Sequence, residues 1–266
     1  KKCPVCEGAT YKEKNEAVLR CTNTYGCYAQ QISQIIHFSS KKALNIDGFG
    51  EKQAKQFYDL KIISNIADIF LLEKNKNIIE NLEGWGSLSV KNLISSIDKS
   101  KTIDLDKFIY SLGIRFIGEI NAEILAKEFK NIDNFLSLSD NTSVLANIDG
   151  LGPKAVSSII EYFSHPQNLS LIKELSKILV VKNNIVSNSK NFFNNKSIIF
   201  TGTLNSISRD EAKHMAKEVG AKILSSVTKN TDYVIVGDKA GSKEKKAREL
   251  NLKTFSEKDF LKKIKS

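Results

Sequence analysis

The hydrophobic positions in the middle of the chain recur at a spacing that predicts paired helices. Apolar residues lead into a Gly-apolar-Gly turn at residues 45–50 (NIDGFG), and the turn returns at residues 147–152 (NIDGLG). Two looser copies lie between them, at residues 82–86 (LEGWG) and 112–118 (LGIRFIG). The last glycines of the four copies are 36, 32 and 34 residues apart, and each is followed four positions later by a small residue: Ala54, Val90, Ala122 and Val156. This period is typical of a repeated supersecondary unit, here a helix, a tight hairpin and a second helix packed closely on the first.

Towards the end of the chain the pattern changes to alternating strands and helices. Ser208 and Glu211 form a capping box that opens a helix, and Gly220 ends that helix. The other predicted elements are strands at residues 197–201, 222–224, 233–236 and 253–255, a basic helix at residues 242–250 and a closing helix capped by Ser256. This alternation predicts a small parallel sheet with helices on both faces.

The glycines of the four turns suit contact with the DNA backbone. Glycine adopts positive φ and has no Cβ to block a ligand. The second helix of each unit then begins with N–H groups that have no partner within the helix, at the positive end of its dipole, which is a ready site for a phosphodiester. Ordinary helix connections in an all-α domain are the alternative, but four copies in register favour DNA binding. The candidate DNA-binding residues are Gly48, Gly50, Lys52, Gly84, Gly86, Gly113, Gly118, Gly150, Gly152 and Lys154.

All four cysteines lie within the first 27 residues, as Cys3 and Cys6 and then, after fourteen residues, Cys21 and Cys27. Two such pairs supply four thiolates to one structural zinc site with no open coordination position. Two disulfides are the alternative, although a chain of this length can hold a core without them. We expect one zinc ion on these cysteines, and we expect the histidines not to be ligands: His37, His165 and His214.

Charge agrees with a polyanionic partner but is unevenly distributed. The formal net charge is +10 and the pI about 9.2. Residues 192–266 hold 16 Lys and Arg against 9 Asp and Glu, or +7, whereas residues 1–191 hold 24 against 21, or +3. The helical repeats are therefore expected to bind through main-chain N–H groups and a few lysines. No apolar run approaches the ~20 residues of a membrane-spanning helix.

These patterns predict a multidomain chain. We expect a four-cysteine zinc unit at residues 1–30, an all-α helix-hairpin-helix domain at residues 31–180 that begins with a helix over residues 31–42, a linker at residues 181–195, and an α/β domain at residues 196–266. The chain has no initiator Met and opens two residues before a metal ligand, so we expect it to be part of a longer protein.

The α/β domain resembles a BRCT domain. The residues that carry the resemblance are Phe200-Thr201-Gly202-Thr203-Leu204, Arg209, Gly220-Ala221-Lys222, Ser226-Val227-Thr228-Lys229, Thr231, Gly237, Ala240-Gly241-Ser242-Lys243 and Lys246-Ala247. The order of zinc unit, four hairpins and BRCT domain is similar to the bacterial NAD-dependent DNA ligases over essentially the whole chain. Two places depart from that family: Phe116 stands where the third hairpin would have its first glycine, and Ser87-Leu88-Ser89 stands where the second usually has a lysine.

The resemblance implies that the longer protein seals nicks: NAD adenylates a lysine, AMP passes to the 5′-phosphate, and the 3′-hydroxyl attacks. That lysine belongs to a Lys-x-Asp-Gly motif, and both Asp-Gly pairs of this chain have asparagine in its place, at Asn45 and Asn147. We therefore expect no catalytic residue in this segment. NAD and Mg would serve the full-length protein and zinc this segment. The expected partner is nicked duplex DNA, bound without regard to sequence by a soluble, monomeric, cytoplasmic protein at the bacterial nucleoid, with no membrane contact.

The resemblance also implies a phosphate pocket in the BRCT domain, formed by Thr201, Gly202 and Lys243. The alternative is that Thr201 and Gly202 only shape a turn while Lys243 is solvated. Two other classes of protein remain open for the whole chain. One is a repair nuclease with a DNA-binding tail, and the other is a non-catalytic repair or replication scaffold.

Overall fold

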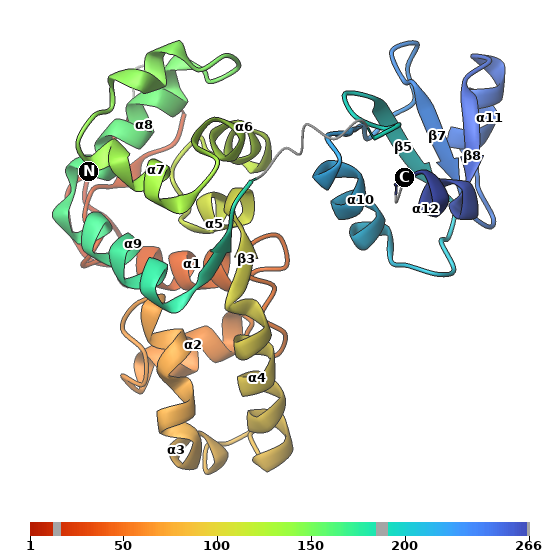
Figure 1. Ribbon diagram of the computed structural model, residues 1–266. Coiled ribbons are helices and arrows are strands. Elements are labelled where there is room, and N and C mark those ends of the chain that lie inside the picture. Colours follow the sequence, from red (N-terminus) through yellow and green to blue (C-terminus); the bar gives the residue numbers. More distant parts are fainter. Residues whose placement is uncertain (13–16, 185–190, 265–266) are drawn as a thin grey trace. The chain divides into compact units, whose positions relative to one another are not determined.

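The computed structural model describes residues 1–12, 17–184 and 191–264 (Figure 1). The chain divides into two compact units, residues 1–184 and residues 185–266. The zinc unit and the helical repeats share the first, and the second is the α/β domain. Among the described residues, no helix is both long and apolar enough to span a membrane.

The zinc unit is a short antiparallel ribbon that leads into a helix. Strand β1 (Thr10–Tyr11) pairs with β2 (Arg20–Cys21), and helix α1 (Tyr28–Ser39) follows. We expected this helix over residues 31–42. It begins three residues earlier because Cys27 is its N-cap, and it ends at Ser39 because Ser40 is extended.

Four helix-hairpin-helix units build the rest of the first unit. Helices α2, α3 and α4 of the first and second hairpins lie at one end of this unit (Figure 1). Helices α6, α7 and α8 of the third and fourth hairpins lie at the other end, and α1, α5 and α9 lie between the two groups. The elements are α2 (Glu51–Asp59), η1 (Ala67–Asn75), α3 (Lys76–Glu80), α4 (Ser87–Ser100), α5 (Leu105–Ser111), α6 (Glu119–Phe129), α7 (Ile132–Leu136), η2 (Ser137–Ser139), η3 (Ser143–Asn147), α8 (Pro153–Ser164) and α9 (Pro166–Ile178).

One continuous hydrophobic core joins all four repeats, from Ile35 to Leu179. The small residues four positions after the hairpins belong to it in three cases, Ala54, Val90 and Ala122, which are fully buried. In the fourth repeat Ala155 takes that place, and Val156 is only half-buried. Burial of this apolar surface is the main force that stabilises helices of this length.

A two-stranded parallel sheet is the departure from an all-α domain. Strand β3 (Thr102–Asp104) pairs in parallel with β4 (Val180–Lys182), and the Val180 N–H donates to the Lys101 carbonyl at 2.7 Å. The first four residues of the expected 181–195 linker, 181–184, therefore belong to the first unit. Residues 185–190 of that linker lie outside the described residues.

The second unit has the predicted parallel sheet, in the order β6-β5-β7-β8. Ile198, Phe200 and Ile235 face a core with α10 and α12, and Ile199 and Val234 face α11 on the other side. Phe193 also lies in the first of these cores, so the domain begins before residue 196. The elements are β5 (Ser197–Thr201), α10 (Arg209–Glu218), β6 (Lys222–Ile223), β7 (Tyr233–Val236), α11 (Ser242–Glu249), β8 (Lys253–Ser256) and α12 (Glu257–Ile264).

Candidate metal centre and nucleic-acid interface

The four cysteines form one cluster. Their Sγ atoms all lie within 4.8 Å of one another, and those of Cys6 and Cys21 are 3.5 Å apart. A tetrahedron of sulfurs at ~2.3 Å from zinc has edges of about 3.8 Å. The arrangement therefore fits zinc. None of the four is in a disulfide, which agrees with a metal site rather than two bridges.

Local backbone structure places each ligand. The Cys3 N–H donates to Gly8 O and the Glu7 N–H to Cys3 O, both at 2.9 Å, which closes the first turn. Cys21 ends strand β2, and Cys27 stands at the N-cap of α1. A thiolate at a helix N-terminus interacts favourably with the dipole.

The cluster shifts the pKa values of two of its thiols in opposite directions. N–H groups of Cys6 and Val5 lower the pKa of Cys3 to about 7. The Asn23 N–H also lowers the pKa of Cys21, but desolvation and the neighbouring thiols outweigh it and raise that pKa to about 11. Four thiolates at these distances repel one another, and a bound dication removes that cost.

Side chains outside the cysteine set fix the zinc unit to the helices. The Gln30 and Gln31 amides donate to the carbonyls of Cys21 and Thr24, both at 2.8 Å. Tyr25 OH donates to Asn168 Oδ1 at 2.8 Å, and its ring packs edge-on against His165. We did not predict the Tyr25 contacts from the sequence, because they join residues at least 140 positions apart and no local pattern marks them.

The first position of each hairpin glycine pair has a left-handed backbone. φ is +81° at Gly48, +83° at Gly84 and +83° at Gly150. The third hairpin has Phe116 at the equivalent place, with φ +63°. The hairpin geometry is thus kept without glycine, at a cost of roughly 1–2 kcal/mol for a residue with a Cβ.

Gly113 does not occupy the equivalent place in the third hairpin. It follows the end of α5 with φ +67°, and a Cβ there would lie 3.3 Å from His37 Cδ2. The structure thus gives Gly113 a role in packing, whereas the tip of the hairpin is Phe116.

The second glycine of each pair has no conformational reason to be glycine. Each is the N-cap of the second helix with an extended backbone (φ −97°, −160°, −83° and −70°): Gly50, Gly86, Gly118 and Gly152. A Cβ would meet nothing within 4 Å at three of them, and at Gly50 only Gln53 Oε1 at 3.5 Å. These four positions are open on the outside, so glycine leaves space for something that approaches the helix N-terminus.

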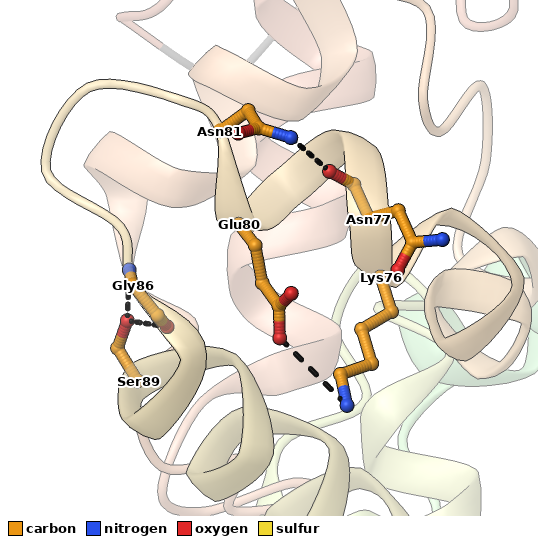
Figure 2. A network of polar contacts seen from close by, with 6 residues as sticks. All are labelled: Lys76, Asn77, Glu80, Asn81, Gly86 and Ser89. Atoms are coloured by element: carbon orange, nitrogen blue, oxygen red, sulfur yellow. Dashed lines mark hydrogen bonds and ion pairs between the residues drawn. The ribbon is translucent and has the colours of Figure 1, made fainter.

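In the first two hairpins a side chain in the first helical turn caps that glycine. Gly86 N–H donates to Ser89 Oγ at 2.9 Å, and Ser89 Oγ donates back to Gly86 O (Figure 2). Gly50 N–H donates to Gln53 Oε1 at 3.3 Å. The next N–H groups of each helix have no acceptor within the helix, so they remain the donors for an anion.

The hairpins are paired by direct contacts. Gly48 and Gly84 line a shallow pocket of about 390 Å³ between the first and second hairpins. Asp47 N–H donates to Ser96 Oγ of α4 at 2.7 Å across that pair. In the second pair, a Cβ at Gly150 would lie 3.1 Å from Ile124 Cδ1 of α6.

Lys52 and Lys154 both occupy the second position of a helix that follows a hairpin, and both are exposed. Lys154 Nζ also lies 5.3 Å from the ring centre of Phe116, and the Arg115 guanidinium lies 4.4 Å from the same ring. The third and fourth hairpins therefore share a cationic surface around one aromatic ring, a feature that the sequence analysis missed because it joins two repeats.

The candidate phosphate pocket of the second unit contains one residue with a clear internal role. Gly202 has φ +79°, and a Cβ there would lie 2.5 Å from Gly237 O and 2.7 Å from Asp238 O. Its carbonyl accepts from Arg209 Nη2 at 2.5 Å. Thr201 is buried and Lys243 half-buried. This geometry favours the turn-forming role for Gly202.

Replacing Gly202 with alanine is expected to destabilise the second unit by about 1–3 kcal/mol, because the Cβ is strained at positive φ and collides with backbone. Gly241 is the matched control, since it has φ −106° and open space around its Cβ. Denaturant melts of Gly202→Ala and Gly241→Ala check this. Equal midpoints for both would contradict the close approach.

Comparison with known protein families identifies the class of each part. Residues 2–29 match the NAD-dependent DNA ligase C4 zinc finger domain, residues 107–172 the helix-hairpin-helix motif and residues 188–262 the BRCA1 C Terminus (BRCT) domain. The chain is thus a zinc-finger, helix-hairpin-helix and BRCT protein, as the sequence predicts. The match and the cysteine cluster confirm zinc as the metal of this segment.

Curated relatives are DNA ligases. That of Rickettsia bellii (strain OSU 85-389) is 42% identical over 97% of this chain, and that of Ehrlichia chaffeensis is 43% identical over 96% of this chain. In both cases the matched region is 39% of the relative's length. That of Rickettsia prowazekii is 43% identical over 99% of this chain and 40% of the relative. The resemblance to the zinc-finger, helix-hairpin-helix and BRCT part of the bacterial NAD-dependent DNA ligases is confirmed, and the chain spans about 40% of the length of these relatives.

Proposed function

We propose that this chain is the DNA-binding portion of an NAD-dependent DNA ligase that seals nicks in duplex DNA. The observation that carries the proposal is the set of four open helix N-termini, each behind a glycine whose missing Cβ serves no internal packing. Main-chain donors of this kind hold phosphates and carry no sequence information. The segment would grip the duplex, and the adenylation chemistry, with its NAD and Mg, would belong to other parts of the full-length protein.

The first test is the salt dependence of binding. We expect nicked duplexes of unrelated sequence to bind equally well and binding to weaken with salt. The log–log slope should be modest, because the net charge of residues 1–191 is only +3. Fluorescence anisotropy over a salt series, with sedimentation to confirm a monomer, measures this. Binding that depended strongly on sequence, or no binding at low salt, would contradict the proposal.

The other two classes of protein make different predictions for the full-length chain. A ligase forms a covalent AMP adduct when it is incubated with NAD and Mg, whereas a scaffold does not, and a nuclease cleaves the duplex instead. A mass increase of one AMP on the intact full-length protein therefore identifies a ligase, and cleavage of the duplex separates a nuclease from a scaffold. We place the protein in the bacterial cytoplasm at the nucleoid, where its substrate lies.

For the second unit we propose a phosphate contact by Thr201 and Lys243, which substitution of these two residues tests directly. The two-residue variant Thr201→Ala, Lys243→Ala should lower affinity for a 5′-phosphorylated nicked duplex by a few-fold while it leaves the unphosphorylated duplex unchanged. A helix N-terminus with an adjacent lysine favours such an anion. Equal binding of both duplexes by wild type and variant would leave Thr201 with a turn-forming role and Lys243 as a solvated charge.

A further inference from the structure

The second position of the helix that follows each hairpin is charged in two hairpins and aliphatic in the other two. The four residues at this position are Lys52, Leu88, Ile120 and Lys154. Leu88 and Ile120 are 69% and 75% exposed, the two most exposed large hydrophobic side chains in the part of the chain that the structure describes. Single exposed apolar residues are ordinary, but these two coincide in repeat position.

The two lysines and the two aliphatic residues are divided equally between the two pairs of hairpins. The first hairpin, with Lys52, packs beside the second, with Leu88, around the shared pocket. The third, with Ile120, packs beside the fourth, with Lys154, through Phe116 and Gly150. Each pair therefore presents one ammonium group and one branched aliphatic group at equivalent places.

Leu88 and Ile120 do not contribute to the hydrophobic core of the unit. The hydrophobic core includes Val90 and Leu93 of α4 and Ala122 and Leu125 of α6, on the faces that pack inwards. Leu88 and Ile120 are not in that core or among the residues packed against it. The reason for an aliphatic group at this position must therefore be sought outside the chain.

The chemistry of the DNA backbone supplies a partner for both kinds of side chain. A helix N-terminus that meets a phosphate places its second residue next to that phosphate. A lysine there reaches a phosphate oxygen. A leucine or isoleucine there reaches the neighbouring deoxyribose, whose C–H face is apolar and the same in every nucleotide. Minor-groove proteins also place apolar side chains against DNA, although as wedges between base steps.

We propose that Leu88 and Ile120 bind deoxyribose faces of duplex DNA, one in each hairpin pair, beside the phosphate contacts of Lys52 and Lys154. This inference rests on the proposed function and names the part of the ligand that two of the four hairpins recognise. It also explains how the second hairpin contributes without a lysine in the first turn of its second helix, which reads Ser87-Leu88-Ser89.

The test separates apolar from ionic contacts by salt dependence. In this chain, the double variant Leu88→Ser, Ile120→Ser should lower affinity for nicked duplex about ten-fold with an unchanged log–log salt slope, because no ion is released. Lys52→Ala, Lys154→Ala should instead reduce the slope by about 2, one for each lysine. Leu88→Met, Ile120→Met should restore binding. Val180→Ser, at an apolar side chain that is 64% exposed and outside the hairpins, is the matched control.

The outcomes distinguish this inference from the proposed function. If wild type binds DNA and the double serine variant binds equally well, the aliphatic contacts are absent and only this inference fails. A reduced slope for that variant would also overturn it, because the contact would then be ionic. If wild type does not bind DNA at low salt, both the proposed function and this inference fail. Thermal melts of all variants should coincide, since the replaced side chains are outside the core.

Discussion

Removal of zinc is expected to unfold residues 2–29 while the helical core and the second unit remain folded. Zinc binding by small cysteine-rich units contributes an apparent ~10–16 kcal/mol. Apart from a few hydrogen bonds such as that of Tyr25 to Asn168, little apolar packing holds this segment, since the continuous core begins at Ile35. Thiolate repulsion at sulfur separations within 4.8 Å adds to the loss. We expect one zinc per chain, and none after replacement of Cys3 and Cys6 with serine.

Limited proteolysis with and without a chelator, followed by circular dichroism, measures this. New cleavage should be confined to the first 30 residues, with most of the helical signal retained. Tyr25→Phe is the control, because it removes the 2.8 Å hydrogen bond to Asn168 but no metal ligand. That variant should keep its zinc. Purified chain without zinc but with protected cysteines would contradict the metal site.

Local sequence patterns predicted the second unit well. Strands β5 and β7 have the predicted bounds, and Ser208 Oγ accepts from the Glu211 N–H at 3.1 Å, which is the N-cap half of the predicted capping box. Gly220 ends the helix with φ +84°. These features depend on neighbours in sequence, which is why they could be recognised without the structure.

What the sequence did not predict depends on distant neighbours. Strand β4 has three residues and an irregular pattern, and it forms only because β3, 78 residues earlier, offers its edge. Phe193 appeared to belong to a polar linker, yet it is completely buried against Phe260 and Phe255. A strand or aromatic anchor of this size carries too little periodicity to be seen locally.

The hairpins combine both situations. Their period and glycines are local, so their existence was predictable. The different roles of the two glycines of a pair were not predictable, because these roles depend on φ and on the space around each Cβ. The first glycine relieves backbone strain in the turn, because the left-handed backbone there is costly for a residue with a Cβ such as Phe116, with φ +63°. The second is needed only if a ligand approaches.

Replacement of the second glycine is therefore expected to lower DNA affinity strongly without unfolding the hairpin. The double variant Gly50→Val, Gly152→Val is expected to lower affinity for nicked duplex on the order of 100-fold. Its side chains would fill the space before two helix N-termini, and each hydrogen bond to a charged phosphate contributes ~1.5–3 kcal/mol. Stability should fall by only about 1 kcal/mol for each change of N-cap, since both glycines have extended backbones with room for a Cβ.

Gly48→Ala provides the contrast, because φ there is +81°. It should destabilise the fold by about 1 kcal/mol through backbone strain, while the N-terminus of α2 stays open to phosphate. Anisotropy titrations and denaturant melts on the three proteins separate the two roles. If the double valine variant binds nicked DNA as wild type does, the phosphate does not approach through these glycines. The main-chain donors of these two hairpins would then not be the contact, and binding would have to rest on side chains, the other hairpins and the basic second unit.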